Sequence, residues 1–193
     1  MMRHFIALVS MLIFGAGTVH AQDTAIWKEI NGWSIGIDRT LNFGCFIYGV
    51  YERGTSIRVG LNQADQNGYI LVGNPGWQSL EQGKKYDLSF QFDRDPPWSG
   101  PASAIVIDGK PSLVLPFNKA EFFRDFAEKQ TLFVRYQNTT VATLNLRGSY
   151  AAVQELLTCQ ETVEKMRKKP GQEQSGDPFA PAVRRDNSDP FKQ

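Results

Sequence analysis

Two carboxylates and an aromatic side chain lie close together near the middle of the sequence. Asp93 and Asp95 flank Arg94, and Trp98 follows in the Pro- and Gly-rich stretch Arg94–Pro101. Paired carboxylates beside an aromatic platform are the residue types that glycoside hydrolases use. The same spacing is also typical of a solvated loop with a local Asp–Arg pair. Because a calcium site needs roughly six to eight oxygen ligands, this short cluster predicts no metal centre.

Most other catalytic chemistry is missing from the chain beyond its N-terminus. The only histidines are His4 and His20, and both lie in a segment that we expect to be removed. The rest of the chain therefore cannot form a Ser-His or Cys-His nucleophile or a histidine metal site. It also lacks a P-loop, a G-x-G-x-x-G and a G-x-S-x-G motif. We expect no enzymatic activity, no cofactor and no metal.

The N-terminal segment has the three parts of a secretory signal peptide. Arg3 supplies positive charge, Phe5–Phe14 is an apolar run, and Val19-His20-Ala21 places small residues before a cleavage site. An apolar run of about ten residues is too short for a membrane span of about 20. We predict that residues 1–21 are a cleaved signal peptide, with an uncleaved anchor as the alternative. The periplasm is the expected location, and secretion to the exterior is the alternative.

The composition of the mature chain limits its partners. Removal of Arg3 changes the formal charge of +1 to a value near zero, so we expect no nucleic acid partner. No later apolar run has membrane length, and we expect no integral membrane segment after cleavage. About 170 residues suffice for one domain with its own core.

Cys45 and Cys159 are the only cysteines. An even number of cysteines in an exported chain favours one disulfide, and two free buried thiols are the alternative. A bond that closes so long a loop stabilises the fold by about 4–5 kcal/mol in the chain-entropy model.

Alternating apolar residues predict a mostly β domain over residues 22–166. After a lead-in at 22–31, we expect eight or nine strands, including the clear period-two pattern of Tyr86–Phe92. Trp77–Gly83 is expected to form a helical turn, and Arg94–Pro101 a loop that presents Trp98, because proline cannot donate in a central strand.

Two helices complete the expected fold. Asn118 with Glu121 resembles a capping box for the first, and Ser149 starts the second, which carries Cys159. The prediction is an antiparallel β-sandwich or barrel of the α+β class, with two helices, the C-terminal one tied by the disulfide.

The C-terminal residues 167–193 are expected to be a disordered tail. They are rich in Lys, Arg, Pro, Gly, Asp and Gln and hold too few apolar groups to offset the entropy of ordering. The tripeptide Asp-Pro-Phe occurs at 177–179 and again at 189–191. It is either a repeated docking motif or a chance repetition in a biased segment.

The segment Leu144–Cys159 reads LNLRGSYAAVQELLTC, a strand that runs through Gly148-Ser149 into a helix with a late cysteine. It resembles the end of the invasion-associated locus B family and of accessory proteins associated with type VI secretion. This chain lacks further cysteines of the first family. The resemblance implies an envelope protein with a β-sandwich fold.

These observations favour a non-catalytic binding or accessory protein that acts on an envelope protein through protein–protein contacts. Trp98, with Trp77 second, is the expected binding residue, because loop aromatics often anchor proteins or glycans; lids over the end of a barrel are the alternative. An inhibitor or immunity protein against a cell-wall-degrading enzyme, and a glycan hydrolase using Asp93 and Asp95, are the other hypotheses.

Overall fold

The computed structural model describes residues 23–168. The predicted signal peptide at 1–21 and both Asp-Pro-Phe copies lie outside the described residues, as does nearly all of the predicted tail.

Ten strands form one sheet, in the order β1-β2-β3-β4-β5-β8-β7-β6-β9-β10. Every pair of neighbours is antiparallel. The strands are β1 (Thr24–Ile30), β2 (Trp33–Asp38), β3 (Gly44–Val50), β4 (Ser56–Asn62), β5 (Asn67–Gly73), β6 (Lys85–Phe92), β7 (Trp98–Ile107), β8 (Lys110–Phe117), β9 (Thr131–Tyr136) and β10 (Thr139–Asn145). A short 3-10 helix, η1 (Glu52–Gly54), joins β3 to β4.

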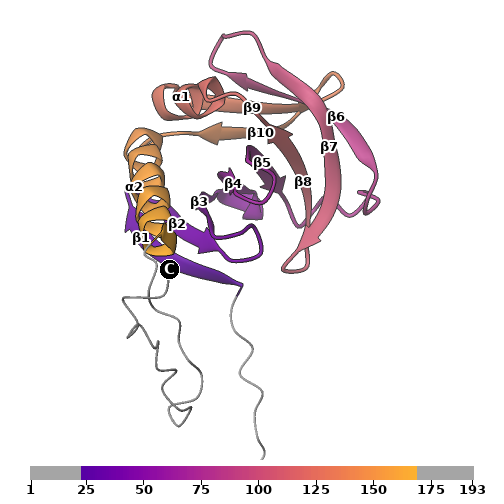
Figure 1. Cartoon of the computed structure of the whole chain (residues 1–193). Helices are drawn as coiled ribbons and strands as arrows, with labels where there is room; N and C mark the ends of the chain where they lie inside the picture. Colours follow the sequence, from indigo (N-terminus) through magenta and orange to yellow (C-terminus); the bar gives the residue numbers. More distant parts are fainter. Residues whose placement is uncertain (1–22, 169–193) are drawn as a thin grey trace, which may run out of the picture.

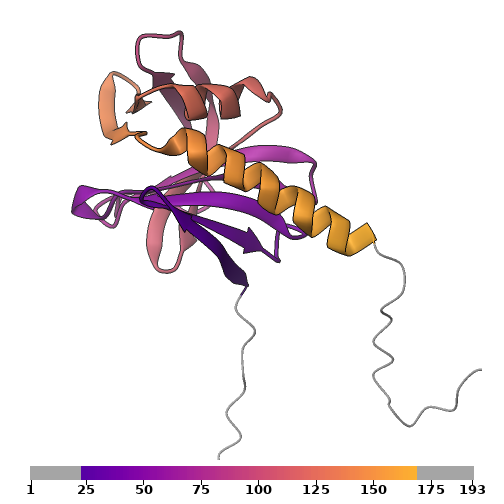
Figure 2. The same cartoon turned by 90° about the vertical axis from the view of Figure 1, so that its left-hand side faces the viewer.

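The sheet curls on itself, so that β6, β9 and β10 lie above β1 to β4 (Figure 1). Two α-helices lie on its open side: α1 (Glu121–Glu128) and α2 (Ser149–Lys168). β10 leads into α2, which contacts β1, β2, β3 and α1. The helix therefore bridges the two edges of an unclosed sheet (Figure 2).

The core lies on the inner face of this curl, under both helices. Alternate residues of each strand point inward, as the period of two requires. Fully buried examples are Ile35, Ile57, Ile70, Phe90 and Leu132.

Helix α1 is attached to the sheet by aromatic side chains. Phe122 and Phe126 are fully buried, and the Phe122 ring contacts the rings of Phe90, Phe92 and Phe117 at centroid distances of 6.4, 5.3 and 4.2 Å. The predicted capping box is wrong, because Ala120 precedes the helix and no side chain caps it.

Helix α2 carries the predicted disulfide. Cys45 on β3 is bonded to Cys159, with a Cα–Cα distance of 6.2 Å. Beside it, the buried side-chain oxygen of Gln160 accepts a hydrogen bond of 2.9 Å from the backbone N–H of Cys45.

Three local predictions are wrong. The lead-in at 22–31 contains strand β1, where a register shift between Ile26 and Lys28 interrupts the alternation. Trp77–Gly83 forms successive turns without a helix. Strand β7 begins at Trp98, inside the stretch Arg94–Pro101 that was expected to be a loop. The first half of β7 pairs with β6 but not with β8. Pro101 has no backbone N–H, and on the β8 side no described strand is paired there to accept a hydrogen bond from it.

The predicted fold class is confirmed: a mostly antiparallel β domain with two helices and the Cys45–Cys159 bond. Its strands number ten over residues 23–168, rather than eight or nine, and the facing layers belong to one curled sheet. No helix in this range has the length and hydropathy of a membrane span.

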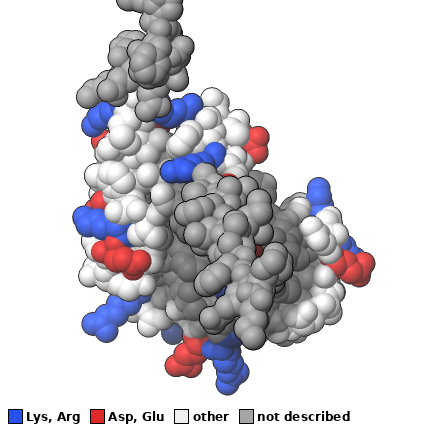
Figure 3. Space-filling view, turned by 90° about the horizontal axis from the view of Figure 1, so that it is seen from below, with Lys and Arg blue, Asp and Glu red and all other residues white. Residues whose placement is uncertain are grey.

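Acidic and basic side chains are mixed over the described part of the lower face. Figure 3 shows Lys and Arg interspersed with Asp and Glu there, with no continuous patch of either sign.

Candidate functional site

Asp93 connects the end of β6 to the segment after α1. Its carboxylate accepts backbone hydrogen bonds from Thr131, at 2.8 Å, and from Gln130, at 3.3 Å. The backbone N–H of Asp93 in turn donates to the Thr131 carbonyl at 2.9 Å. These bonds give Asp93 a structural role, which is to hold the end of β6 to the segment after α1.

Asp95 and Arg94 have separate surroundings. The carboxylate of Asp95 pairs with Lys129 at 2.6 Å, while Arg94 is exposed. The structure therefore shows neither the expected Asp–Arg pair nor two free carboxylates around one space. Within residues 23–168, no group of acidic, histidine or cysteine side chains is arranged to hold a metal ion.

Trp98 is half-buried and packs on α1. Its indole N–H donates to the Asp125 carboxylate at 3.0 Å, and its ring meets Phe122 edge-on at 5.6 Å. The Lys119 ammonium lies 5.6 Å from the centre of the indole ring. These contacts correct the expectation of an aromatic side chain presented on a loop.

Trp77 lies in the turns between β5 and β6, where its backbone N–H donates to the Asn74 carbonyl at 3.1 Å. Its ring is half-buried against the core. A binding role for Trp77 or Trp98 stays a prediction.

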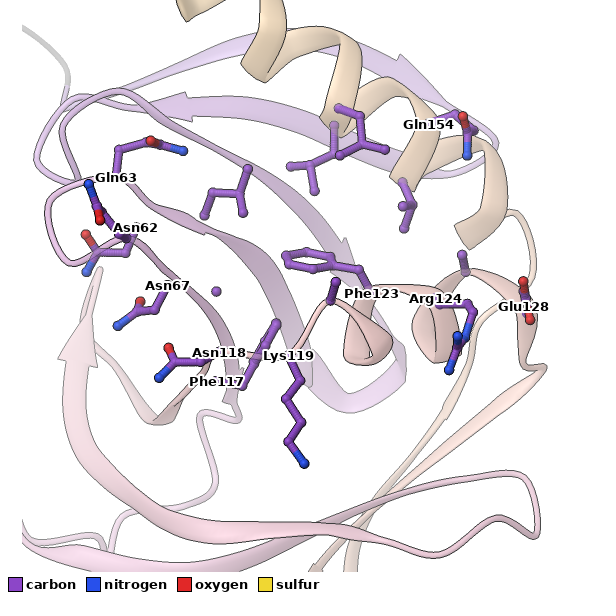
Figure 4. A pocket seen from close by; sticks show the side chains of 18 of the residues that line it. Asn62, Gln63, Asn67, Phe117, Asn118, Lys119, Phe123, Arg124, Glu128 and Gln154 are labelled. Atoms are coloured by element: carbon purple, nitrogen blue, oxygen red, sulfur yellow. The ribbon is translucent and has the colours of Figure 1, made fainter.

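A groove of about 790 Å³ opens between α1, the first half of α2 and the β4–β5 turn. This volume lies within the usual range of roughly 300–1,000 Å³ for ligand sites. Figure 4 shows Phe123 projecting into the groove and a group of amides along one side. We call it the helix groove.

Apolar side chains from three elements form the floor of the helix groove. Phe117 ends β8, Phe123 comes from α1, and Leu156 comes from α2. The Phe117 ring is fixed from two sides, since it stacks on Phe122 at 4.2 Å and meets Phe123 at 5.2 Å. Gly68 is required beneath it, because a Cβ there would lie 2.4 Å from the Phe117 ring.

The rim of the helix groove is mostly neutral. Six amide side chains line it: Asn62, Gln63, Gln66, Asn67, Asn118 and Gln154. An amide side chain both donates and accepts hydrogen bonds without charge. Lys119, Arg124 and Glu128 are the charged lining residues, so this groove holds one carboxylate among the described residues.

Two apolar side chains on the groove wall face solvent. Tyr150 is 60% exposed and Leu157 is 48% exposed, and both come from α2. Burial of such side chains against a partner removes apolar surface from water.

Sequence reasoning missed the helix groove. Its lining comes from five separated segments, and its amides match no catalytic or metal-binding motif. The run Asn62–Gly68 indicated a polar turn, but its position beside α1 and α2 depends on how the sheet curls.

Neither a family model nor a curated protein matches this chain. Among solved structures, its fold is similar to that of invasion-associated protein B from Bartonella henselae, with a TM-score of 0.51 and 14% sequence identity. The match covers 69% of this chain and 97% of the other. At that identity the similarity shows a shared fold. It agrees with the first of the two resemblances of Leu144–Cys159, and the second stays a prediction.

Proposed function

We propose that this protein is an exported, non-catalytic binding protein that acts through contacts with another protein of the bacterial envelope. The observation that carries the proposal is the helix groove, with its apolar floor, exposed wall residues and amide rim. The periplasm is its proposed location, because a disulfide between β3 and α2 suits an oxidising compartment.

The chemistry of the groove favours a segment of polypeptide as occupant. Apolar side chains of a partner would pack on Phe117, Phe123 and Leu157, and the amides around them match the N–H and C=O groups of its backbone. Mixed charges at the rim give no preference for a strongly ionic ligand. Tyr150 supplies a large exposed aromatic surface, which is typical of binding hot spots.

The same lining offers little for acid–base catalysis. Glu128 is the single carboxylate among the described residues of the groove, whereas glycoside hydrolysis uses two. The Asp93 carboxylate accepts backbone hydrogen bonds, and the Asp95 carboxylate forms an ion pair with Lys129.

The test is capture of the partner from the native envelope. Tagged mature protein is lightly crosslinked, purified and analysed by mass spectrometry, as wild type and as Leu157→Arg. The matched control is Val50→Arg, an apolar-to-charged change at a residue that is 61% exposed and lines no part of the groove. Far-UV circular dichroism checks that each variant folds.

We expect one dominant protein that Leu157→Arg loses and Val50→Arg retains. The identity of that protein then separates an accessory role from inhibition of a cell-wall-degrading enzyme, which a lysozyme and amidase panel measures directly. Retention of the partner by Leu157→Arg contradicts the groove assignment. Glycan fragments in place of a protein, or turnover of peptidoglycan by the wild type, contradict the proposed function.

A further inference from the structure

A second cavity, of about 460 Å³, lies on the face of the sheet that points away from the core. Phe46, Tyr69 and Leu71 are buried on this face, at 5%, 6% and 6% exposure, yet they lie outside the main core cluster. They alternate with the core residues Ile47 and Ile70 along β3 and β5. We call this space the outer cavity.

One wall of the outer cavity contains a buried ion pair. Arg58 on β4 contacts the carboxylate of Asp38 at the end of β2, and its guanidinium lies 3.7 Å above the Phe46 ring. Asp38, 6% exposed, also accepts hydrogen bonds from the backbone and hydroxyl of Thr40, at 2.8 and 2.6 Å. Burial favours a higher pKa for Asp38, but the bonds from Thr40 and Arg58 and the charge of Arg58 hold it below its ordinary value.

Three residues that line this cavity each hold a buried polar atom with no hydrogen-bond partner in the described protein: Arg58 Nε, the Tyr69 hydroxyl and Asn67 Oδ1. Buried polar groups are usually paired, and each unpaired one is destabilising. Arg58 Nε donates, Asn67 Oδ1 accepts, and the Tyr69 hydroxyl does either. Gly60 leaves room for that hydroxyl, since a Cβ there would lie 2.9 Å from it.

Polar and apolar residues occupy opposite sides of the outer cavity. Asp38 and Arg58 come from β2 and β4, whereas Ile105 and Val114 come from β7 and β8. β5, which carries Tyr69 and Leu71, lies between these two groups in the sheet. Of the three residues with an unpaired atom, Arg58 lies on the polar side and Asn67 and Tyr69 lie on the central strand β5, so none comes from the apolar side.

The charges that line the outer cavity do not favour an anionic ligand. Arg58 is neutralised by Asp38, and the remaining charged lining residue, Asp65, accepts a hydrogen bond from Asn62 at 2.9 Å. A second acid near the polar end disfavours carboxylates and phosphates.

We propose that the outer cavity is a binding site for a small neutral amphiphile, whose uncharged hydroxylated head lies beside Arg58, Tyr69 and Asn67 and whose alkyl part lies against Ile105 and Val114. The outer cavity shares Asn62 and Asn67 with the rim of the helix groove, and its other lining residues are different.

The probe is octyl glucoside, used below its critical micelle concentration with the full mature chain labelled with nitrogen-15. Glucose provides the head alone, and octanoate provides the same alkyl length with an anionic head. We expect saturable amide shifts for octyl glucoside in β4, β5 and β8, and at least about tenfold weaker binding of the other two, as expected when one strong contact is lost.

Two substitutions test the two ends of the cavity. Tyr69→Phe removes one hydroxyl and is expected to weaken binding about tenfold without lowering thermal stability, because that hydroxyl has no partner in the described protein. Ile105→Asp adds a charge at the apolar end and is expected to abolish binding. Its matched control is Val106→Asp, the next residue of the same strand, which is 51% exposed and does not line the cavity.

Leu157→Arg in the helix groove is expected to bind the probe as the wild type does, so failure of the proposed function and failure of this inference are distinguishable. Shifts confined to α1 and α2, equal binding of octanoate, or equal loss with Val106→Asp would overturn the proposal. So would the absence of saturable binding, or unchanged affinity of Tyr69→Phe.

Discussion

The two helices are attached to the same sheet by different interactions. α2 is bonded to β3 through Cys45–Cys159 and reaches β1 through Glu155, which accepts hydrogen bonds from Trp27 and Lys28 at 2.9 and 2.8 Å. α1 has no covalent link. It depends on Phe122 and Phe126, both fully buried among other aromatic rings.

The difference means that the helix groove has one wall fixed by a covalent bond and another fixed by packing. A disulfide acts mainly by restricting the unfolded chain, whereas buried rings stabilise the native state in proportion to the surface they remove from water. Changes that weaken one attachment should therefore loosen one wall of the groove before the other.

The largest effect is expected from removal of the disulfide. Replacing Cys45 and Cys159 with Ala should lower the free energy of unfolding by about 4–5 kcal/mol, because the unfolded chain regains the entropy of a long loop. Urea denaturation measures the loss, and amide exchange should increase more in α2 than in α1. The opposite order of exchange would contradict the comparison. Adding a reductant to the wild-type protein breaks the same disulfide without a substitution and should give the same result.

Phe122→Ala is expected to be nearly as severe, at about 4 kcal/mol, since it leaves a cavity among four aromatic rings. Here amide exchange should increase first in α1. The matched control is Phe123→Ala, which removes a half-buried ring from the same helix and should destabilise the fold less. Equal losses for the two variants would show that packing of Phe122 does not hold α1.

Asp93→Ala tests how much the hydrogen bonds to the segment just after α1 contribute to stability. The carboxylate bonds to two backbone N–H groups just after α1, so its loss should destabilise the domain by about 1–2 kcal/mol. Asp95→Ala removes a partly exposed pair with Lys129 and should change stability by less than about 1 kcal/mol. Thermal denaturation separates the two, and a larger effect of Asp95→Ala would be inconsistent with the assigned roles.

The smallest effect is a pH dependence on the α2 side. Hydrogen bonds from Lys28 and Trp27 hold the pKa of Glu155 below its ordinary value. A carboxyl whose pKa falls on folding stabilises the protein above its unfolded pKa and loses that contribution as pH falls through the folded pKa. Wild type should exceed Glu155→Gln in melting temperature at pH 7, by an amount worth less than about 1 kcal/mol. That difference should shrink below about pH 4, and a constant difference would contradict it.

The sequence was most informative where one physical requirement dominates. Strands such as β6 must alternate to bury one face, and the alternation of Tyr86–Phe92 identified it. The pairing of Cys45 with Cys159 followed from their being the only two cysteines. Buried Phe122 and Phe126 followed from helical spacing, although the cap at Asn118 did not form.

The errors occurred where neighbours in space decide the local structure. Pro101 indicated a loop, but it is accommodated because the first half of β7 pairs on one side. Trp98 was expected on a loop, yet it begins β7 and packs against Phe122 and Asp125 of α1. Both cavities escaped prediction because their residues converge only when the sheet curls.

The disulfide closes only after every strand of the sheet has entered the chain. Cys45 and Cys159 are 114 residues apart, and strands β4 to β10 all lie between them in the chain. Every sheet pairing can therefore form before the second thiol arrives. A bond formed after the rest of the fold slows opening of the finished domain more than it speeds assembly. Besides restricting the unfolded chain, the disulfide is therefore expected to lengthen the lifetime of the folded state.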